Sequence, residues 1–230
     1  MLAYNAPAPV TGGNSTVDPM SSTMDPVGSN PPVTSGNAIG MVSGQQAPRV
    51  HHIWLVTGPA GCGKTTVARY LSQALNLPYL EGDAFHPPAN IDRMANGIPL
   101  TDCDRWDWLT LLREESLRQL ASGAEGVVLT CSALKRKYRD VIRVAPYFTH
   151  DVLLHFIYLH APENVLIERV GARVGHYMGP NMVRSQFEIL EPPTAEETDV
   201  ISIDVSGPEP EVLSMALRQV QDKISETTTA

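Results

Sequence analysis

Residues 58–65 spell G-x-x-x-x-G-K-T and directly follow the apolar run 53–56. A strand, a glycine-rich turn and a helix in this order form a phosphate-binding P-loop. The backbone N–H groups of such a turn converge on an anion, and the helix adds the positive end of its dipole. We therefore expect Lys64 to contact the β- and γ-phosphates of a nucleoside triphosphate and Thr65 to bind Mg²⁺. The residues expected to bind the nucleotide here are Gly58, Pro59, Ala60, Gly61, Cys62, Gly63, Lys64, Thr65 and Thr66.

Apolar runs alternate with helical patterns along the rest of the chain. Expected strands are 53–56, 79–80, 127–130, 153–159 and 200–205; expected helices are 65–75, 104–121, 135–144, 163–173 and 211–224. Strands joined by helical crossovers predict an α/β fold with a parallel five-stranded sheet and helices on both faces. Ligands of such a sheet bind at the carboxyl ends of its strands.

The segment 175–193 interrupts this alternation and is rich in Gly and Pro. A long insertion on the ligand side predicts a small mobile lid, with an ordinary surface loop as the alternative.

Composition divides the chain into a tail and one domain. Residues 1–48 contain no Lys or Arg, and 23 of them are Pro, Gly, Ser or Thr, so we expect a disordered tail. Residues 49–226 form the expected P-loop kinase domain, and 227–230 a flexible C-terminus. A net charge of −8 argues against a nucleic-acid partner, and no run approaches the ~18 apolar residues of a membrane span. Three cysteines without C-x-x-C spacing indicate free thiols and a cytoplasmic location.

Two carboxylates follow the second expected strand. A kinase acting on an alcohol needs a carboxylate near the γ-phosphate to orient the hydroxyl, and Asp83 occupies that place. Glu81, two residues earlier on the strand, points the same way and is expected to hold a Mg²⁺-bound water. An Asp after a strand can also be a helix cap. His86 is either a substrate ligand or a structural turn residue.

Several cations face the same end of the sheet. Arg105 opposes the dipole of the helix it begins, so we expect it to bind an anionic substrate group. Lys135 and Arg139, spaced i to i+4, are expected to point together toward the site, unless they form a solvated helix face. Arg169 and Arg173 enter the lid and are expected catalytic groups that neutralise the transferring phosphoryl; cations at a helix end are also favoured by the dipole.

The segment 58–193 resembles the gluconokinases, small P-loop sugar-acid kinases related to shikimate and adenylate kinases. The matching residues are 58–65, Gly82-Asp83, His86-Pro87, Asn90, Met94, Gly97-x-Pro-Leu, Asp102-x-Asp-Arg105, Trp108-Leu109, Cys131–Lys135, Tyr138–Asp140, Arg173, Gly175-His176, Gln186–Glu188 and Leu190–Pro192. The resemblance implies ATP-dependent phosphorylation of D-gluconate at its 6-hydroxyl, giving 6-phosphogluconate and ADP and feeding the pentose phosphate pathway.

The resemblance also implies a set of residue roles. Asp83 would orient the terminal hydroxyl of gluconate, and Gly207-Pro208 would border the adenine. The implied substrate ligands are His86, Arg105, Lys135, Arg139 and Gln186. A shikimate-like or nucleoside monophosphate kinase is the alternative, and a homodimer stays open. A GTPase-like switch is disfavoured. The guanine-binding motif N-K-x-D is absent, and D-x-x-G occurs only at 25–28, before the P-loop, and at 204–207, in the final strand region.

Overall fold

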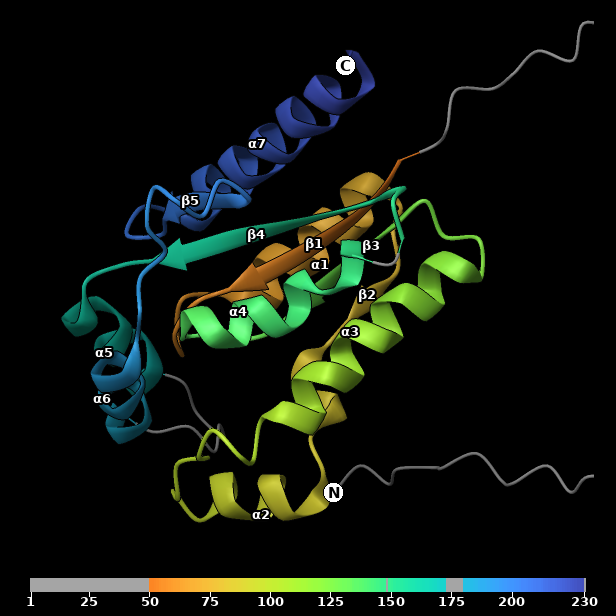
Figure 1. Ribbon diagram of the computed structural model, residues 1–230. Helices are drawn as coiled ribbons and strands as arrows, with labels where there is room; N and C mark the ends of the chain where they lie inside the picture. Colours follow the sequence, from red (N-terminus) through yellow and green to blue (C-terminus); the bar gives the residue numbers. More distant parts are fainter. Residues whose placement is uncertain (1–49, 148, 173–179, 230) are drawn as a thin grey trace, which may run out of the picture. The chain divides into compact units, whose positions relative to one another are not determined.

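A parallel sheet forms the centre of the described chain (Figure 1). The computed structural model describes residues 50–147, 149–172 and 180–229, so the expected tail 1–48 lies outside the described residues. Within those ranges the strands are β1 (His51–Thr57), β2 (Tyr79–Leu80), β3 (Gly126–Thr130), β4 (Val152–His160) and β5 (Val200–Asp204). Their order is β2-β3-β1-β4-β5, and every pairing is parallel. The expected five-stranded parallel sheet is confirmed.

Helices cover both faces of this sheet. Successive side chains of the central strand β1 point to opposite faces, so each face of β1 packs against a different pair of helices. Trp54 and Val56 pack in one apolar cluster with α1 (Lys64–Leu75) and α7 (Glu209–Thr229). Ile53 and Leu55 pack in a second cluster with α3 (Trp106–Ala121) and α4 (Arg136–Arg143). Both faces of β1 are therefore buried, which explains its continuous apolar run.

Two helices are not predicted by the sequence pattern. Helix α2 (Pro88–Ala95) has only eight residues and begins at a proline. Helix α6 (Pro180–Ile189) occupies part of the expected lid; it lies beside α5 (Glu163–Gly171), and Val183 is fully buried in the core. Lid residues 190–193 follow α6 without regular secondary structure, whereas lid residues 175–179 and Arg173 lie outside the described residues.

Short elements connect the sheet to these helices. A 3₁₀ helix, η1 (Gly82–Phe85), follows β2, and η2 (Ala145–Tyr147) follows α4. Helix α7 continues to Thr229, past the expected domain end at residue 226. No helix in the described ranges is both long and apolar enough to cross a membrane.

Candidate functional site

The P-loop joins β1 to α1 as the motif predicts. Gly58 has a φ of 136°, and a Cβ there would lie 2.3 Å from the carbonyl oxygen of Leu159 on β4. A side chain at this position would therefore clash with the neighbouring strand. Gly63, with a φ of 88°, is the N-cap of α1, so that Lys64 and Thr65 form the first turn of the helix. The turn thus lies at the carboxyl end of the central strand.

Lys64 and Thr65 contact the loop and the end of β2. The Lys64 ammonium donates to the carbonyls of Gly58 at 2.9 Å and Pro59 at 3.0 Å, which holds it over the loop. The Thr65 hydroxyl donates to a Glu81 carboxylate oxygen at 3.1 Å. The expected closeness of Thr65 and Glu81 is therefore present.

Glu81 is held as an acceptor by two more hydroxyl groups. Thr130 Oγ1 donates to its other oxygen at 2.5 Å, and the Tyr79 hydroxyl donates to the oxygen that Thr65 contacts. Burial and the Glu81 carboxylate raise the pKa of Tyr79 to about 12, so that Tyr79 remains a donor at neutral pH. The described residues contain no group of three or more His, Cys, Asp or Glu side chains that could hold a metal. Mg²⁺ in phosphate sites typically takes only one or two protein ligands, so the pair Thr65 and Glu81 fits this ion.

One cavity of about 190 Å³ gathers most of the expected substrate residues. This volume is below the ~300–1,000 Å³ typical of drug-sized ligands, and it suits a small molecule. The expected residues that line it are Ala60, Lys64, Asp83, His86, Arg105 and Gln186. They come from the P-loop, η1 and the segment after it, the start of α3, and α6. Asp83, Lys64 and Arg105 thus line the same cavity.

His86 and Arg105 each present a polar atom without a partner among the described residues. The His86 ring stacks on Trp108, with centroids 3.9 Å apart, and only 7 % of the residue is exposed. Burial and the nearby charge of Arg105 lower the pKa of His86 to about 4, so the ring is neutral at pH 7. His86 Nδ1 and Arg105 Nε are both buried without a hydrogen-bond partner in the described chain, although Arg105 Nη2 donates to the Leu100 carbonyl at 3.0 Å. Buried polar atoms are normally satisfied, and both residues line the cavity, so a water molecule or a polar ligand there would supply the missing partners.

Gln186 connects α6 to the P-loop. Its side-chain oxygen accepts the Ala60 N–H at 2.7 Å, and the residue lines the same cavity as Asp83. Helix α6 therefore forms a wall of the cavity, in the segment that the sequence predicts as a mobile lid, with a surface loop as the alternative.

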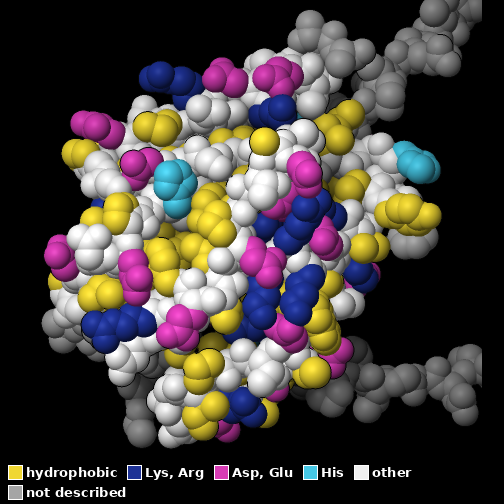
Figure 2. Space-filling model, turned by 60° about the vertical axis from the view of Figure 1, so that its left-hand side comes forward, with side chains coloured by type: hydrophobic (Ala, Val, Ile, Leu, Met, Phe, Trp, Pro, Cys, Tyr) yellow, Lys and Arg dark blue, Asp and Glu magenta, His cyan; other side chains and the backbone are white. Residues whose placement is uncertain are grey.

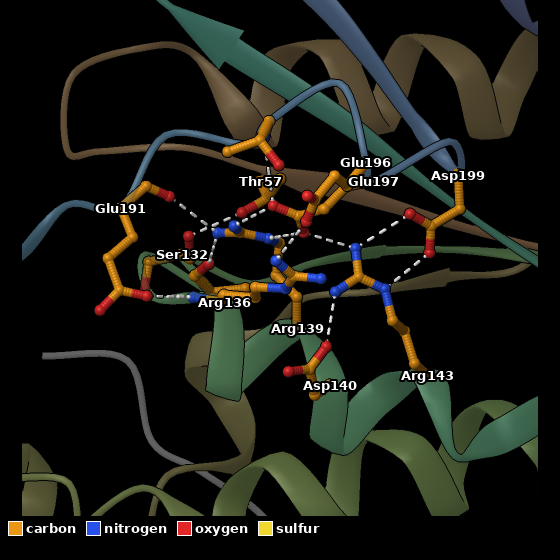
Figure 3. Close-up of polar contacts among 12 residues, drawn as sticks. Thr57, Ser132, Arg136, Arg139, Asp140, Arg143, Glu191, Glu196, Glu197 and Asp199 are labelled. Atoms are coloured by element: carbon orange, nitrogen blue, oxygen red, sulfur yellow. Dashed lines mark hydrogen bonds and ion pairs between the residues drawn. The ribbon is translucent and has the colours of Figure 1, made fainter.

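The expectation for Arg139 as a substrate ligand is wrong. Its side chain is 2 % exposed, and Nε and Nη2 each donate to the Glu197 carboxylate at 2.7 Å (Figure 3). Hydrogen bonds from Arg139 and Arg143 outweigh the effect of burial and lower the pKa of Glu197 to about 2. Helical i to i+4 spacing does not apply to the pair, because Lys135 is the extended N-cap of α4.

Lys135 also has a protein partner, at the edge of the site. Its ammonium contacts Asp102 at 3.1 Å, and Lys137 and the Tyr138 hydroxyl bind the same carboxylate. Donation from Lys137, Tyr138 and Lys135 holds the pKa of Asp102 well below its usual range.

Figure 2 shows that Lys and Arg side chains are interleaved with Asp and Glu side chains on one face of the molecule.

Arg169 lies on the other side of the P-loop from Asp83. Its guanidinium donates to the Val205 carbonyl at 2.7 Å, and it lines a second pocket with Thr66 and Gly207. The structure therefore does not bring Arg169 into the cavity of Asp83. The Pro208 carbonyl accepts N–H groups from the first turn of α7 at 3.1 and 3.2 Å. Arg173, the other expected catalytic arginine, lies outside the described residues.

Eight residues that line the cavity were not predicted as site residues: Met94, Pro99, Leu100, Ser132, Met182, Ser185, Glu188 and Ile189. Ser132 lies two residues after the end of β3, and the rule that ligands bind at the carboxyl ends of strands was enough to select it. Met182 and Ser185 lie on α6, which the sequence pattern does not predict as a helix.

The three cysteines are free thiols in two different environments. Cys62 and Cys131 are each 2 % exposed, whereas Cys103 is exposed. Burial raises the pKa of Cys131 to about 12 and also raises that of Cys62. The two buried thiols are therefore protonated at neutral pH.

Known proteins resemble this chain across the same region. A family profile described as an AAA domain matches residues 55–187. The chain is 48 % identical over 157 residues to a probable gluconokinase of Schizosaccharomyces pombe, covering 68 % of this chain and 81 % of that relative. It is 39 % identical over 158 residues to the thermoresistant gluconokinase of Escherichia coli, covering 69 % of this chain and 87 % of that relative.

Solved structures agree with the sequence relatives. A gluconokinase from Sinorhizobium meliloti superposes with a TM-score of 0.67 at 38 % identity, over 80 % of this chain and 98 % of the other. An APS kinase from Mycobacterium tuberculosis superposes with a TM-score of 0.52 at 18 % identity, over 78 % of this chain and 99 % of the other, a likeness of fold alone. The P-loop kinase fold is therefore confirmed.

Proposed function

The chain belongs to the gluconokinase family, and we propose that it transfers the γ-phosphoryl group of ATP to the 6-hydroxyl of D-gluconate. One observation carries the proposal beyond the family. Lys64 of the P-loop and Asp83 line one small cavity together with Arg105, His86 and Gln186. This lining supports a site where a phosphate donor meets a polar, anionic acceptor.

Asp83 orients the acceptor hydroxyl and takes up its proton. Phosphoryl transfer requires little covalent work from the protein, so positioning beside Lys64 is the larger contribution. Arg105 binds the gluconate carboxylate through its cavity-facing guanidinium. The neutral His86 ring offers Nδ1 to a sugar hydroxyl, and Gln186 offers its amide group.

Thr65 and Glu81 would hold Mg²⁺ beside the phosphates, Thr65 directly and Glu81 through a water molecule. The ion supplies charge neutralisation on the phosphate oxygens when it is bound. Glu81 suits this role because three protein hydroxyls already orient its two oxygens.

The second pocket is proposed to accept the adenosine part of ATP. It adjoins Gly63 and Thr66 on the helix side of the P-loop and Gly207 on the β5–α7 loop. We place Arg169 there as a nucleotide contact rather than over the sugar. Residues 175–193 are proposed to act as a lid, with Arg173 closing over the transferring phosphoryl. The free thiols accord with a cytoplasmic enzyme.

A substrate panel tests the proposal. The purified chain with ATP and Mg²⁺ is assayed for ADP release with gluconate, shikimate and nucleoside monophosphates. We expect turnover with gluconate to exceed that with every other acceptor at least ~100-fold, because the buried polar atoms lining the cavity would lack partners with the wrong acceptor. Equal or faster turnover with shikimate or a monophosphate would refute the assignment. Omitting Mg²⁺ should abolish turnover.

A further inference from the structure

A buried ion pair joins α4 to the segment between α6 and β5 (Figure 3). Arg139 and Glu197 are each 2 % exposed in their side chains, and their two contacts are 2.7 Å long. Neither residue lines the cavity that contains Asp83. Well-packed apolar residues often stabilise a core as well as a buried ion pair does, so stability alone does not account for these charges.

The remaining terminal nitrogen of Arg139 contacts two separate stretches of backbone. Nη1 donates to the Ala133 carbonyl at 3.2 Å and to the Glu191 carbonyl at 3.1 Å. Ala133 has a φ of 35°, which a residue other than glycine holds only where its surroundings enforce it. The preceding residue, Ser132, lines the cavity, and its carbonyl accepts the Thr57 hydroxyl at 2.6 Å. This loop is thus fixed by β1 on one side and by Arg139 on the other.

Glu191 fixes the end of α6 to the same loop. Its N–H donates to the Leu134 carbonyl at 2.9 Å, and its carboxylate accepts the Arg136 N–H at 2.7 Å. Helix α6 ends two residues earlier and carries Gln186, the cavity residue that accepts the Ala60 N–H. Arg139 therefore holds both the loop after β3 and the end of α6.

The outer contacts of this network are more exposed. Arg143 pairs with Glu197 at 2.6 Å and with Asp199 at 2.8 Å, and its side chain is 22 % exposed. Arg136 pairs with Glu196, and both side chains are more than half exposed. Exposed pairs contribute little, so the buried pair at the centre decides the geometry.

We infer that Arg139 and Glu197 are positioning residues that fix the spacing between two walls of the sugar cavity, the wall at Ser132 and the wall at Gln186. This role rests on the proposed function, because it concerns the half of the site assigned to gluconate. Neither residue touches the substrate.

A double variant separates positioning from stability. Arg139→Met alone removes the fully buried partner of Glu197 and leaves the half-buried Arg143 as its remaining cation, so it should lower the melting temperature. Arg139→Met with Glu197→Leu removes both charges and should recover most of that loss. The carbonyls of Ala133 and Glu191 still lack their donor, so kcat/KM for gluconate should remain at least ~10-fold below wild type, because small displacements of positioning groups are costly. The Kd for ATP without sugar should stay within ~2-fold.

A double variant with wild-type melting temperature and wild-type kcat/KM would overturn the inference. If the double variant does not fold, Glu197→Gln replaces it, because glutamine keeps the shape of the side chain and one acceptor oxygen. A wild-type kcat/KM in Glu197→Gln would also overturn the inference. Arg136→Met is the matched control on α4, and its exposed pair should be dispensable. Hydrogen exchange of residues 186–191 without substrate gives a second readout. Exchange there should be faster in the double variant than in wild type. This measurement does not depend on gluconate being the substrate, so unchanged exchange would refute the positioning role whether or not the proposed function holds.

Discussion

Gly82→Ala tests how tightly η1 packs against β3, next to the cavity that Asp83 lines. Gly82 lies between Glu81 and Asp83, and a Cβ there would be 1.9 Å from the carbonyl oxygen of Thr130. Separating the two atoms to 3.0 Å requires a shift of roughly 1.1 Å in one of two backbones, and neither is a flexible side chain. The shift acts directly on the residue proposed to orient the substrate hydroxyl.

The same shift strains two hydrogen bonds of Gly82. Its N–H donates to Thr130 Oγ1 at 3.1 Å, and its carbonyl accepts the Trp108 indole N–H at 2.8 Å. Overpacking of a core costs ~1–3 kcal/mol and a buried unsatisfied donor ~1–3 kcal/mol, so we expect a loss of about 2–6 kcal/mol in unfolding free energy. At ~2–4 °C per kcal/mol for a domain of this size, that corresponds to a fall of roughly 4–24 °C in melting temperature. A displacement of ~1 Å at Asp83 should also lower kcat about 100-fold.

The assay combines calorimetry with steady-state kinetics. Gly171→Ala is the matched control, because a Cβ at Gly171 would meet no atom within 4 Å and the residue ends α5 in an ordinary helical stretch. That variant should be neutral or more stable by ~0.5–1 kcal/mol. If Gly82→Ala keeps both the melting temperature and kcat of wild type, the close approach of η1 to β3 is not what holds Asp83 in place.

Two further predictions concern charge. Asp83→Asn should lower kcat by ~10²–10⁴-fold and leave the Kd for ATP unchanged. Lys64→Ala should lower kcat and also weaken ATP binding. Steady-state kinetics and nucleotide titration of both variants test this, and a wild-type kcat in Asp83→Asn would show that Asp83 is dispensable. Burial, His52 and Lys223 lower the pKa of His155 to about 4, against the opposing effect of Asp199 and Glu226. Because the unfolded chain then binds more protons, unfolding free energy should fall as pH drops from about 6.5 to 4, by up to roughly 3 kcal/mol for this residue. In urea titrations at several pH values, His155→Gln should lose stability less steeply over that window, and an identical pH dependence would contradict this.

The strands were predictable because their apolar runs are interrupted by polar turns. The observed β1 and β4 extend the expected runs by one to two residues at their ends. Helix α6 was not predictable from periodicity, because glycines lie just before it and prolines just after it. Its burial depends on contacts with α5, which the local sequence does not show. Propensity is overridden there by packing, with Val183 in the core.

The site was predictable where local sequence dictates geometry. The P-loop is a contiguous motif and Asp83 follows a strand, so the position of each at the carboxyl end of the sheet could be predicted from the order of elements along the chain. Arg139 was misassigned because its partner Glu197 is 58 residues away, and nothing in the sequence around Arg139 shows that pairing. Gln186 entered through family resemblance only, since its contact with Ala60 spans 126 residues.

The unequal burial of the three thiols makes the native chain suitable for selective labelling. Cys103 is exposed and follows Asp102, the carboxylate that ties the loop before α3 to Lys135, Lys137 and Tyr138. The thiolate is the form of cysteine that attacks a thiol reagent, and Cys62 and Cys131 are buried and protonated. A maleimide dye should therefore attach to Cys103 without any mutagenesis. Its fluorescence would report movement of the loop at the edge of the cavity while substrates bind.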